Sequence, residues 1–305
     1  MRSRPILAVS LALLLAGCNR SAESGAAKKP VVGVSLLTQT HAFYKELEDG
    51  LREEAKVRGL ELVIVACEMD PARQAAQIED FVAQRVAAIL VAPCDSSAIG
   101  PHLAGRARAN IPVFSADIAV RTAPVVSHVA SDNVQGGRLA ARTLAALIGD
   151  TGQVLIIDHP DVASVQDRVR GFDEEMKSLP RITVVGRPAA GGQRARAMAV
   201  MEDMLQAHRT LSGVFGINDD SALGALAVLE AAGRKDVVVV GFDGTPEAEA
   251  AIARGSALKA DVVQHPRTIG KTVIEMIAKH LHGEQVPPLI AVDVGVVDAA
   301  ALAKQ

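Results

Sequence analysis

The segment Val237–Pro246 (VVVVGFDGTP) combines an apolar run with a carboxylate that could bind a ligand. Four consecutive valines are typical of a strand that is buried on both faces of a parallel sheet. The residues GFDG end this strand, and Thr245-Pro246 is a favourable start for a helix. Asp243 is therefore predicted just beyond the carboxyl end of a central strand, where ligands bind in open α/β sheets. The alternative is that Asp243 is only a turn residue between glycines.

The elements that must position Asp243 alternate regularly, which predicts βα units, parallel sheets and right-handed crossovers. Strands are predicted at Val31–Leu37, Leu60–Ala66, Ala87–Ala92, Val113–Ala116, Val125–Ala130, Gln153–Ile157, Ile182–Arg187, Gly213–Ile217, Val237–Gly241 and Ala257–Val263. Helices are predicted at Phe43–Arg58, Pro71–Gln84, Ser96–Ala109, Val134–Ile148, Ser164–Ser178, Arg194–Ala207, Ser221–Ala232, Glu247–Arg254 and Pro266–His282. These strands are too many for one compact sheet of ordinary size. The predicted fold class is α/β, with two doubly wound parallel-sheet lobes.

Residues 1–17 have the pattern of a secretory signal rather than of a folded domain. Two arginines precede a short apolar core at Ile6–Leu15, which is too short to span a bilayer comfortably. The sequence LAGC that closes it resembles a bacterial lipobox, which implies cleavage before Cys18 and lipidation of the Cys18 thiol. The alternatives are a plain signal peptide or an uncleaved anchor. Residues 18–30, rich in Ser, Ala, Gly and Lys, are predicted to form a flexible tether.

Composition excludes several classes of function. The net charge is −3, or −5 once the two signal arginines are removed, and no basic cluster points to nucleic acid. No further run of 18 apolar residues predicts a membrane span. Aromatic residues make up 2% of the chain and Trp is absent, so the core must consist of Val, Ile, Leu and Ala.

Cys67 and Cys94 each follow a predicted strand, and thiols can pair in an oxidising compartment. A sheet of this kind places the first strand between their two strands. Because adjacent strands lie about 4.8 Å apart, the two strand ends are expected about 10 Å apart, too far for a disulfide. We therefore expect both thiols to be unpaired. Neither is expected to bind a metal, because no CxxC or HxxxH spacing accompanies them.

Several motifs that occur in order carry a family resemblance. They are Val125–Gly136 (VVSHVASDNVQG), Phe215–Ala227 (FGINDDSALGALA) and Val237–Pro246, with support from Asn110–Asp117 (NIPVFSAD) and Arg168–Phe172 (RVRGF). From Val31 onward the sequence closely resembles the type I periplasmic sugar-binding proteins of the ribose-binding kind, which are receptors of ABC importers. Repressor relatives share the two lobes but carry an N-terminal helix-turn-helix. Here a lipoprotein signal occupies that place, which excludes the repressor function.

The resemblance implies a hinge of three crossing strands, near Ser131, Gln264 and Asp293. It divides the chain into an N-terminal lobe of residues 31–131 and 265–293, and a C-terminal lobe of residues 132–264 and 294–305. It further implies a monomer that binds a small monosaccharide or polyol between the lobes. This monomer would deliver the ligand to an ABC permease, without a cofactor or a metal. The protein would be held by lipid at the periplasmic membrane or the cell surface.

Family positions for hydrogen bonding to the ligand are occupied by Asp117, Asn218, Asp243 and Gln264. These types suit a sugar, because a carboxylate accepts from two adjacent hydroxyls and an amide both donates and accepts. Phe43 matches a ring that packs on the C–H face of the sugar, and Tyr44 stands where the family often has Phe. An apolar wall with a few placed polar groups is the usual form of such a pocket.

Four departures from the family pattern affect the expected ligand. His41 stands where ribose binders carry Asn, and two clamping arginines are replaced by Ile118 and Gln166. A phenylalanine of the second lobe is replaced by Gly191. Arg168 aligns with a neighbouring arginine that is not expected to substitute. Because buried carboxylates without cations are costly, the resemblance predicts a ligand that brings more donors or positive character, or a protonated His41. Simple ribose is therefore not the expected ligand.

Other polar residues have simpler interpretations. Asp220 is expected to cap the helix that begins at Ser221, and His159 and Asp161 are expected in a loop. His128 is expected to be structural. No nucleophile elbow, phosphate loop or metal motif supports an enzyme. The functions left open are a solute-binding lipoprotein of an importer and, as the alternative, a sensor component that presents its ligand to a membrane chemoreceptor or kinase. A binder of a non-sugar small molecule also stays open.

Overall fold

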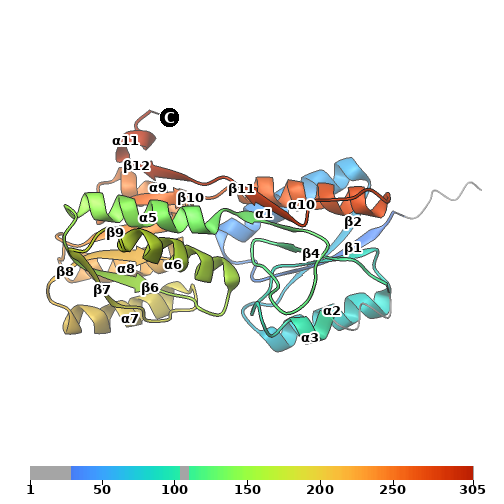
Figure 1. Cartoon of the computed structure of the whole chain (residues 1–305), viewed down its shortest axis with the longest axis horizontal. Helices are drawn as coiled ribbons and strands as arrows, with labels where there is room; N and C mark the ends of the chain where they lie inside the picture. The colour runs from blue at the N-terminus through green and yellow to red at the C-terminus, as the bar shows by residue number, and fades with distance from the viewer. Residues whose placement is uncertain (1–28, 104–109, 305) are drawn as a thin grey trace, which may run out of the picture.

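The computed structural model describes residues 29–103 and 110–304, which form two α/β lobes (Figure 1). Each lobe is built on one six-stranded sheet. The predicted signal, Cys18 and nearly all of the tether lie outside the described residues. Among the described residues, no helix is long and apolar enough to cross a bilayer.

The sheet of the first lobe has the strand order β11-β5-β4-β3-β1-β2, and all its neighbours are parallel. The strands are β1 (Val31–Leu36), β2 (Glu61–Ala66), β3 (Ala88–Val91), β4 (Val113–Ala116), β5 (His128–Ser131) and β11 (Leu289–Val292). The helices of this lobe are α1 (Ala42–Arg58), α2 (Pro71–Gln84), α3 (Gly100–Leu103) and α10 (Pro266–Leu281).

The sheet of the second lobe has the order β12-β10-β9-β8-β6-β7, and only β12 runs antiparallel to its neighbour. The strands are β6 (Gly152–Ile157), β7 (Ile182–Gly186), β8 (Leu211–Gly216), β9 (Val238–Asp243), β10 (Leu258–Val263) and β12 (Gly295–Asp298). The helices are α5 (Asn133–Leu147), α6 (Ala163–Met176), α7 (Arg194–Ala207), α8 (Asp219–Ala231), α9 (Pro246–Ala253) and α11 (Ala299–Leu302).

The chain passes between the two sheets three times, from β5 to α5, from β10 to α10 and from β11 to β12. After the second passage α10 packs against α1, β4 and β5 of the first lobe, so the chain returns to the lobe where it began. These passages join the two lobes on the side where the carboxyl ends of the parallel strands of both sheets lie (Figure 1). The exact limits of the two lobes stay a prediction.

Local sequence explains how the site-bearing elements form. In β9, five of six residues are buried, as expected for the valine run, and Thr245 caps α9 with Pro246 at its first position. Phe172 and Phe215 stack with ring centres 5.1 Å apart in a core that is otherwise mostly aliphatic.

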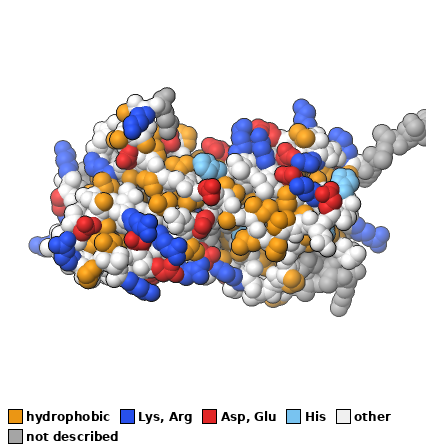
Figure 2. Space-filling view, turned by 45° about the horizontal axis from the view of Figure 1, so that its top comes forward, with side chains coloured by type: hydrophobic (Ala, Val, Ile, Leu, Met, Phe, Trp, Pro, Cys, Tyr) orange, Lys and Arg blue, Asp and Glu red, His pale blue; other side chains and the backbone are white. Residues whose placement is uncertain are grey.

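Charged side chains of both signs are interspersed over the face in Figure 2, so this face offers no basic patch for nucleic acid.

The sequence prediction was incomplete. Strands β11 and β12 and helix α11 were not predicted, because each is only four residues long and little of it is buried. The helix predicted at Ser96–Ala109 is found only as Gly100–Leu103 among the described residues, since 104–109 lie outside them.

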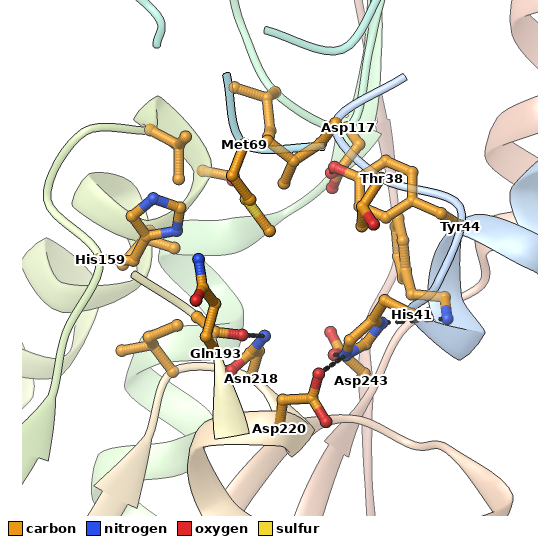
Figure 3. Close-up of a pocket in the computed structure, with 18 of the residues that line it drawn as sticks. Thr38, His41, Tyr44, Met69, Asp117, His159, Gln193, Asn218, Asp220 and Asp243 are labelled. Atoms are coloured by element: carbon orange, nitrogen blue, oxygen red, sulfur yellow. Dashed lines mark hydrogen bonds and ion pairs between the residues drawn. The ribbon is translucent and has the colours of Figure 1, made fainter. Parts of the chain in front are cut away.

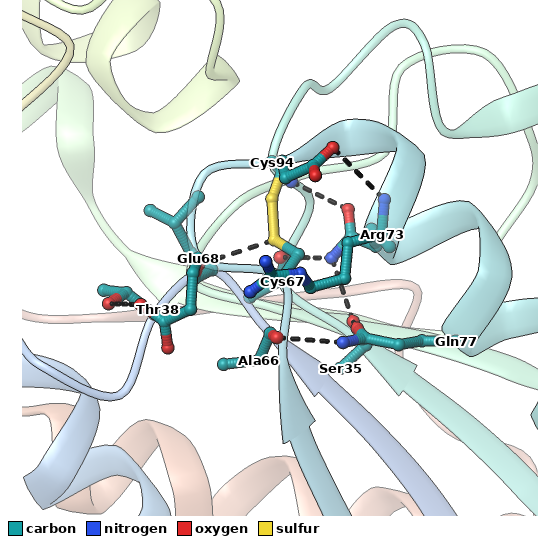
Figure 4. The surroundings of a disulfide bond; sticks show 12 residues. Ser35, Thr38, Ala66, Cys67, Glu68, Arg73, Gln77 and Cys94 are labelled. Carbon is teal, nitrogen blue, oxygen red and sulfur yellow. Dashed lines mark hydrogen bonds between the residues drawn. A yellow bond between two sulfur atoms is a disulfide. The ribbon is translucent and has the colours of Figure 1, made fainter.

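The prediction of unpaired thiols was wrong, because Cys67 and Cys94 form a disulfide (Figure 4). Strand β1 does lie between β2 and β3, as assumed. However, Cys67 directly follows β2 and Cys94 lies three residues beyond β3, so neither is held at the strand spacing. The two loops bend toward each other over the end of β1, and the Cα atoms are 6.8 Å apart.

Candidate functional site

A cavity of about 360 Å³ lies between the two lobes, at the carboxyl ends of their strands. Its size is within the usual range for small-molecule pockets. Most of its polar side chains point inward from both lobes (Figure 3). The wall is formed by Leu37, Thr38, Thr40, His41, Phe43, Tyr44, Glu68, Met69, Asp117, Ile118, His159, Val162, Ser164, Val165, Arg168, Gly192, Gln193, Arg194, Ile217, Asn218, Asp220, Asp243 and Gln264.

Asp117 is the buried carboxylate of the first lobe. It directly follows β4, and its Oδ2 accepts a hydrogen bond of 2.6 Å from the Tyr44 hydroxyl. Burial raises the pKa of Asp117 to about 6, while the charge of Arg168 and the Tyr44 hydrogen bond act in the opposite direction. Burial and the charge of Asp117 raise the pKa of Tyr44 well above its ordinary value, so Tyr44 stays a donor at neutral pH.

Asp243 is the buried carboxylate of the second lobe, at the last position of β9. Its Oδ1 accepts a 2.6 Å hydrogen bond from Gln264 Nε2, and its Oδ2 accepts a longer one, 3.4 Å, from the backbone N–H of Asp219. The other side-chain atom of Gln264, Oε1, is buried without a partner although Gln264 borders the cavity. The second lobe therefore holds its carboxylate in a fixed position at the cavity.

Both carboxylates stand on unusual backbone. Asp117 has φ +62° and Asp243 has φ +139°, a region that residues other than glycine rarely adopt. Such conformations cost about 1–3 kcal/mol each and occur mainly at functional sites. The strain turns each side chain away from its strand and into the cavity.

Arg168 provides the buried cation of the cavity. Its Nε donates to Asn133 Oδ1 at 2.8 Å, and its Nη1 donates to the Ile217 carbonyl at 2.6 Å. The guanidinium also lies 3.8 Å above the centre of the Phe242 ring. Because Arg168 is only 4% exposed, its charge acts strongly on the carboxylates of both lobes.

Asn218 caps helix α8 and forms part of the cavity wall that the second lobe contributes. Its Oδ1 accepts from the N–H of Ser221 and its Nδ2 donates to the Gly192 carbonyl at 3.1 Å. Gly192 has φ +67°, and a Cβ there would lie 3.2 Å from Asn218 Nδ2 and 3.3 Å from His159 Nδ1. Glycine at this position thus keeps the wall open between His159 and Asn218.

His41 reaches across the gap between the lobes (Figure 3). Its Nδ1 accepts the N–H of Phe43 at 3.2 Å and so caps α1, which leaves the proton of the neutral ring on Nε2. That Nε2 lies 3.5 Å from Asp243 Oδ2 and 3.9 Å from Asp220 Oδ2. His41 is therefore a direct polar contact between first and second lobe.

Eight of the ten predicted ligand-binding residues border the cavity. They are His41, Phe43, Tyr44, Asp117, Ile118, Asn218, Asp243 and Gln264. Gln166 does not, because its Nε2 donates to the Pro160 carbonyl on the outside of the second lobe. Gly191 does not either, and its neighbour Gly192 takes the place at the wall. That the eight residues bind a ligand stays a prediction.

The clearest omission of the sequence prediction is Arg168. It was set aside as a neighbour of the expected clamp, yet it supplies the cation that was thought to be lost at Gln166. Helical spacing could have revealed it, since the buried stripe of α6 runs through Val165, Arg168, Val169 and Phe172. Residue 166 falls outside that stripe.

Asp220 and His159 border the cavity, which was not expected. The helix after β8 begins at Asp219 with Asn218 as its cap, so Asp220 is not a cap but borders the cavity. His159 does lie in the loop after β6, as expected, but it is buried there and borders the cavity. Among the described residues, no group of three or more His, Cys, Asp or Glu could hold a metal ion.

A family model described as a periplasmic binding protein domain matches residues 32–285. The chain belongs to this family. A relative in it is the ribose import binding protein RbsB of Bacillus subtilis (strain 168), which is 35% identical over 294 residues; the alignment covers 94% of this chain and 95% of the relative. The xylitol-binding protein of Mycolicibacterium smegmatis (strain ATCC 700084 / mc(2)155) is 30% identical over 250 residues, with 81% and 71% covered.

A solved structure of this family has the same fold. It is an ABC transporter solute binding protein from Mycobacterium smegmatis with bound glycerol, which superposes with a TM-score of 0.86 at 33% identity, covering 90% of this chain and 96% of the other. A periplasmic solute binding protein from Actinobacillus succinogenes 130z with bound D-allose gives 0.84 at 27% identity, covering 91% and 100%. The predicted α/β fold with two parallel-sheet lobes is thus confirmed.

Proposed function

We propose that this protein is the substrate-binding component of an ABC importer and binds a small neutral monosaccharide or polyol between its two lobes. The observation that carries the proposal is the cavity with one strained, buried carboxylate from each lobe, Asp117 and Asp243. Two carboxylates that border one cavity from opposite lobes suit a molecule with hydroxyls at both ends. Family membership makes the protein a receptor rather than an enzyme.

The chemistry of the wall supports a neutral polyhydroxylated ligand. Asp117 and Asp243 offer acceptors, Arg168 offers a donor, and the rings of Phe43 and Tyr44 offer an apolar surface. Acidic groups outnumber arginines at the wall, which disfavours a sugar acid. Relatives named for ribose and xylitol agree with this class.

The structure weakens the expectation that simple ribose is not the ligand. One of its supports, the loss of a cation at Gln166, is removed because Arg168 provides a buried guanidinium. The departures at Ile118 and His41 remain, since both residues border the cavity. The identity of the sugar stays a prediction within the class of neutral sugars and polyols.

Further parts of the proposal concern assembly. The three passages between the sheets act as a hinge between lobes of residues 31–131 with 265–293 and 132–264 with 294–305, and the ligand favours the closed form. The mature protein is a monomer held to the membrane by lipid on Cys18. It delivers its ligand to an ABC permease.

A ligand screen tests the proposal directly. The protein is unfolded and refolded to remove carried ligand, and thermal-shift measurements then compare D-ribose, D-allose, D-tagatose, xylitol and glycerol. We expect at least one to bind with a Kd of about 1 μM or below by calorimetry. In scattering, that compound should reduce the radius of gyration. Binding of none, or of a sugar acid in preference to all neutral compounds, would contradict the proposal.

A further inference from the structure

The disulfide between Cys67 and Cys94 is buried at the edge of the hydrophobic core that adjoins the ligand cavity. It joins the loop after β2 to the loop after β3, over the carboxyl end of β1 (Figure 4). The two residues that follow Cys67, Glu68 and Met69, both border the cavity. One end of the disulfide is therefore continuous with the wall of the cavity.

The Glu68–Met69 turn is a strained piece of backbone. Both residues have positive φ, +51° and +63°, and neither is glycine. Two successive non-glycine residues in this conformation are unfavourable by themselves, so the surrounding structure must hold them. Apart from the disulfide, the turn is held by hydrogen bonds to the loop that leads into α1. Glu68 accepts from Thr38 Oγ1 at 2.7 Å and from Gln39 N at 3.0 Å, and Met69 N donates to the Leu37 carbonyl at 3.3 Å.

The other end of the disulfide is anchored in rigid structure. The N–H of Cys94 donates to Gln74 Oε1 at 2.8 Å, and Gln74, from α2, is 1% exposed. The Nε2 of Gln74 donates in turn to the Ala92 carbonyl and to Ser35 Oγ in β1. The disulfide thus ties the strained turn to a buried hydrogen-bond network of the sheet and α2.

Met69 is the side chain that this arrangement places in the cavity (Figure 3). Methionine has three rotatable bonds and adapts readily to neighbouring shapes, so by itself it makes a poorly defined wall. A fixed backbone limits the directions that its thioether can reach. The thioether donates no hydrogen bond, and it therefore suits the C–H part of a ligand rather than its hydroxyls.

We propose that Met69 is a specificity-determining residue of the cavity and that the Cys67–Cys94 disulfide is the device that positions it. The inference rests on the proposed function, because it concerns the size and shape of the sugar or polyol bound there. With the disulfide intact, Met69 limits the space inside the cavity. Without it, the turn relaxes, the thioether withdraws, and five-carbon and six-carbon ligands are distinguished less well.

The test compares the wild-type protein with Cys67→Ser/Cys94→Ser, and with Met69→Ala in which the disulfide is intact. Calorimetry measures the affinities for D-ribose, xylitol, D-allose and D-tagatose. We expect the ratio between the best five-carbon and the best six-carbon ligand to change at least fivefold in both variants, in the same direction. The control Met198→Ala, on α7 and 37% exposed, should leave the ratio unchanged. A second double variant, Cys67→Ala/Cys94→Ala, also lacks the disulfide but introduces no buried hydroxyls. It therefore separates the loss of the disulfide from the effect of the serine side chains.

A second measurement needs no ligand and so separates this inference from the proposed function. Hydrogen peroxide oxidises methionine side chains according to their accessibility, and peptide mass spectrometry gives the rate at each residue. Met69 should oxidise several-fold faster in the double serine variant than in the wild type, with Met198 unchanged. If the wild type binds no compound of the panel, the proposed function fails and this rate alone decides the inference. Equal rates, or affinity ratios unchanged in Met69→Ala, would overturn it.

Discussion

Asp117 and Asp243 face the same cavity from opposite lobes but have different surroundings. Both follow or end a parallel strand, both have positive φ and both are nearly buried. Asp117 receives one protein hydrogen bond, from Tyr44, and burial raises its pKa to about 6. Asp243 receives hydrogen bonds from Gln264 and from the backbone of Asp219, and it also faces His41 of the other lobe.

The difference indicates that the two lobes contribute to ligand binding in different ways. The second lobe holds its carboxylate in place with its own donors, and such preorganisation lowers the cost of binding. The first lobe leaves most of the hydrogen-bond acceptor capacity of Asp117 unused, so a ligand must supply the donors there. The second lobe is therefore expected to give most of the affinity, and the first lobe to make binding depend on pH.

Asp243→Ala should have the largest effect. It removes an acceptor from ligand hydroxyls that become buried on binding, and it leaves Gln264 Nε2 without its partner. We expect the affinity for the tightest compound of the panel to fall by about 2–4 kcal/mol, roughly 30-fold to 1,000-fold. Calorimetry measures the loss, and Gln166→Ala outside the cavity is the matched control. A variant that unfolds while its folded fraction binds normally would make Asp243 a structural residue.

The pH dependence of binding tests the other side of the comparison. A carboxyl with a raised pKa is neutral below that pKa, so Asp117 loses its charge as the pH falls through about 6. Affinity should therefore fall roughly tenfold between pH 7.5 and pH 5, one pH unit below the pKa. Asp117→Asn should bind more weakly at pH 7.5 but show a flat profile. If the affinity of the wild-type protein does not change with pH, or increases as the pH falls, the proposed role of Asp117 in pH-dependent binding is contradicted.

Asp243 was predicted from the apolar run that it follows, because parallel strands bring their carboxyl ends to one edge, whereas Asp117 was predicted only through the family resemblance. The α/β alternation was likewise predicted from the apolar runs. The assignment at Gln166 failed because residues two apart on a helix face different directions, and α6 turns Arg168 inward instead. The disulfide could not be predicted because it depends on how two loops bend beyond their strands, and strand spacing says nothing about that.

The second lobe differs from the first in a further way, because it contains a pair of buried carboxyl groups close to Asp243. Asp219 and Asp261 lie close together in the second lobe, where a Cβ on Gly241 would be 3.0 Å from Asp219 Oδ1 and 3.1 Å from Asp261 Oδ2. Burial first, and then the charge of Asp219, raises the pKa of Asp261 well above its ordinary value. Asp261 is therefore protonated in the folded protein at a pH where the unfolded chain is ionised.

The sign of the stability effect follows from proton counts. The folded state binds more protons than the unfolded state between about pH 4, the unfolded pKa, and the raised folded pKa, so stability falls as the pH rises through that window. Asp261→Asn stays neutral and should remove this loss. We expect a gain of roughly 1 kcal/mol at pH 8, about 2–4 °C in Tm, and a smaller gain at pH 5. Denaturant midpoints at both pH values measure it, with Asp203→Asn on the exposed part of α7 as the control. Destabilisation at pH 8 would mean that Asp261 is needed as an ionised group.

The smallest effect is expected at His41, the residue that joins the two sides. In His41→Asn the shorter side chain can still cap α1, but it cannot reach Asp243 or Asp220 across the gap. Contacts of 3.5 and 3.9 Å between a histidine and carboxylates are weak, so closure should lose only about 0.5–1 kcal/mol, a two- to fivefold loss of affinity. His41→Ala should add a loss of stability, because the cap is then missing as well. Calorimetry and thermal unfolding of both variants separate the two roles. A loss beyond 100-fold in His41→Asn would mean that His41 binds the ligand itself, and the first lobe would then contribute as much affinity as the second.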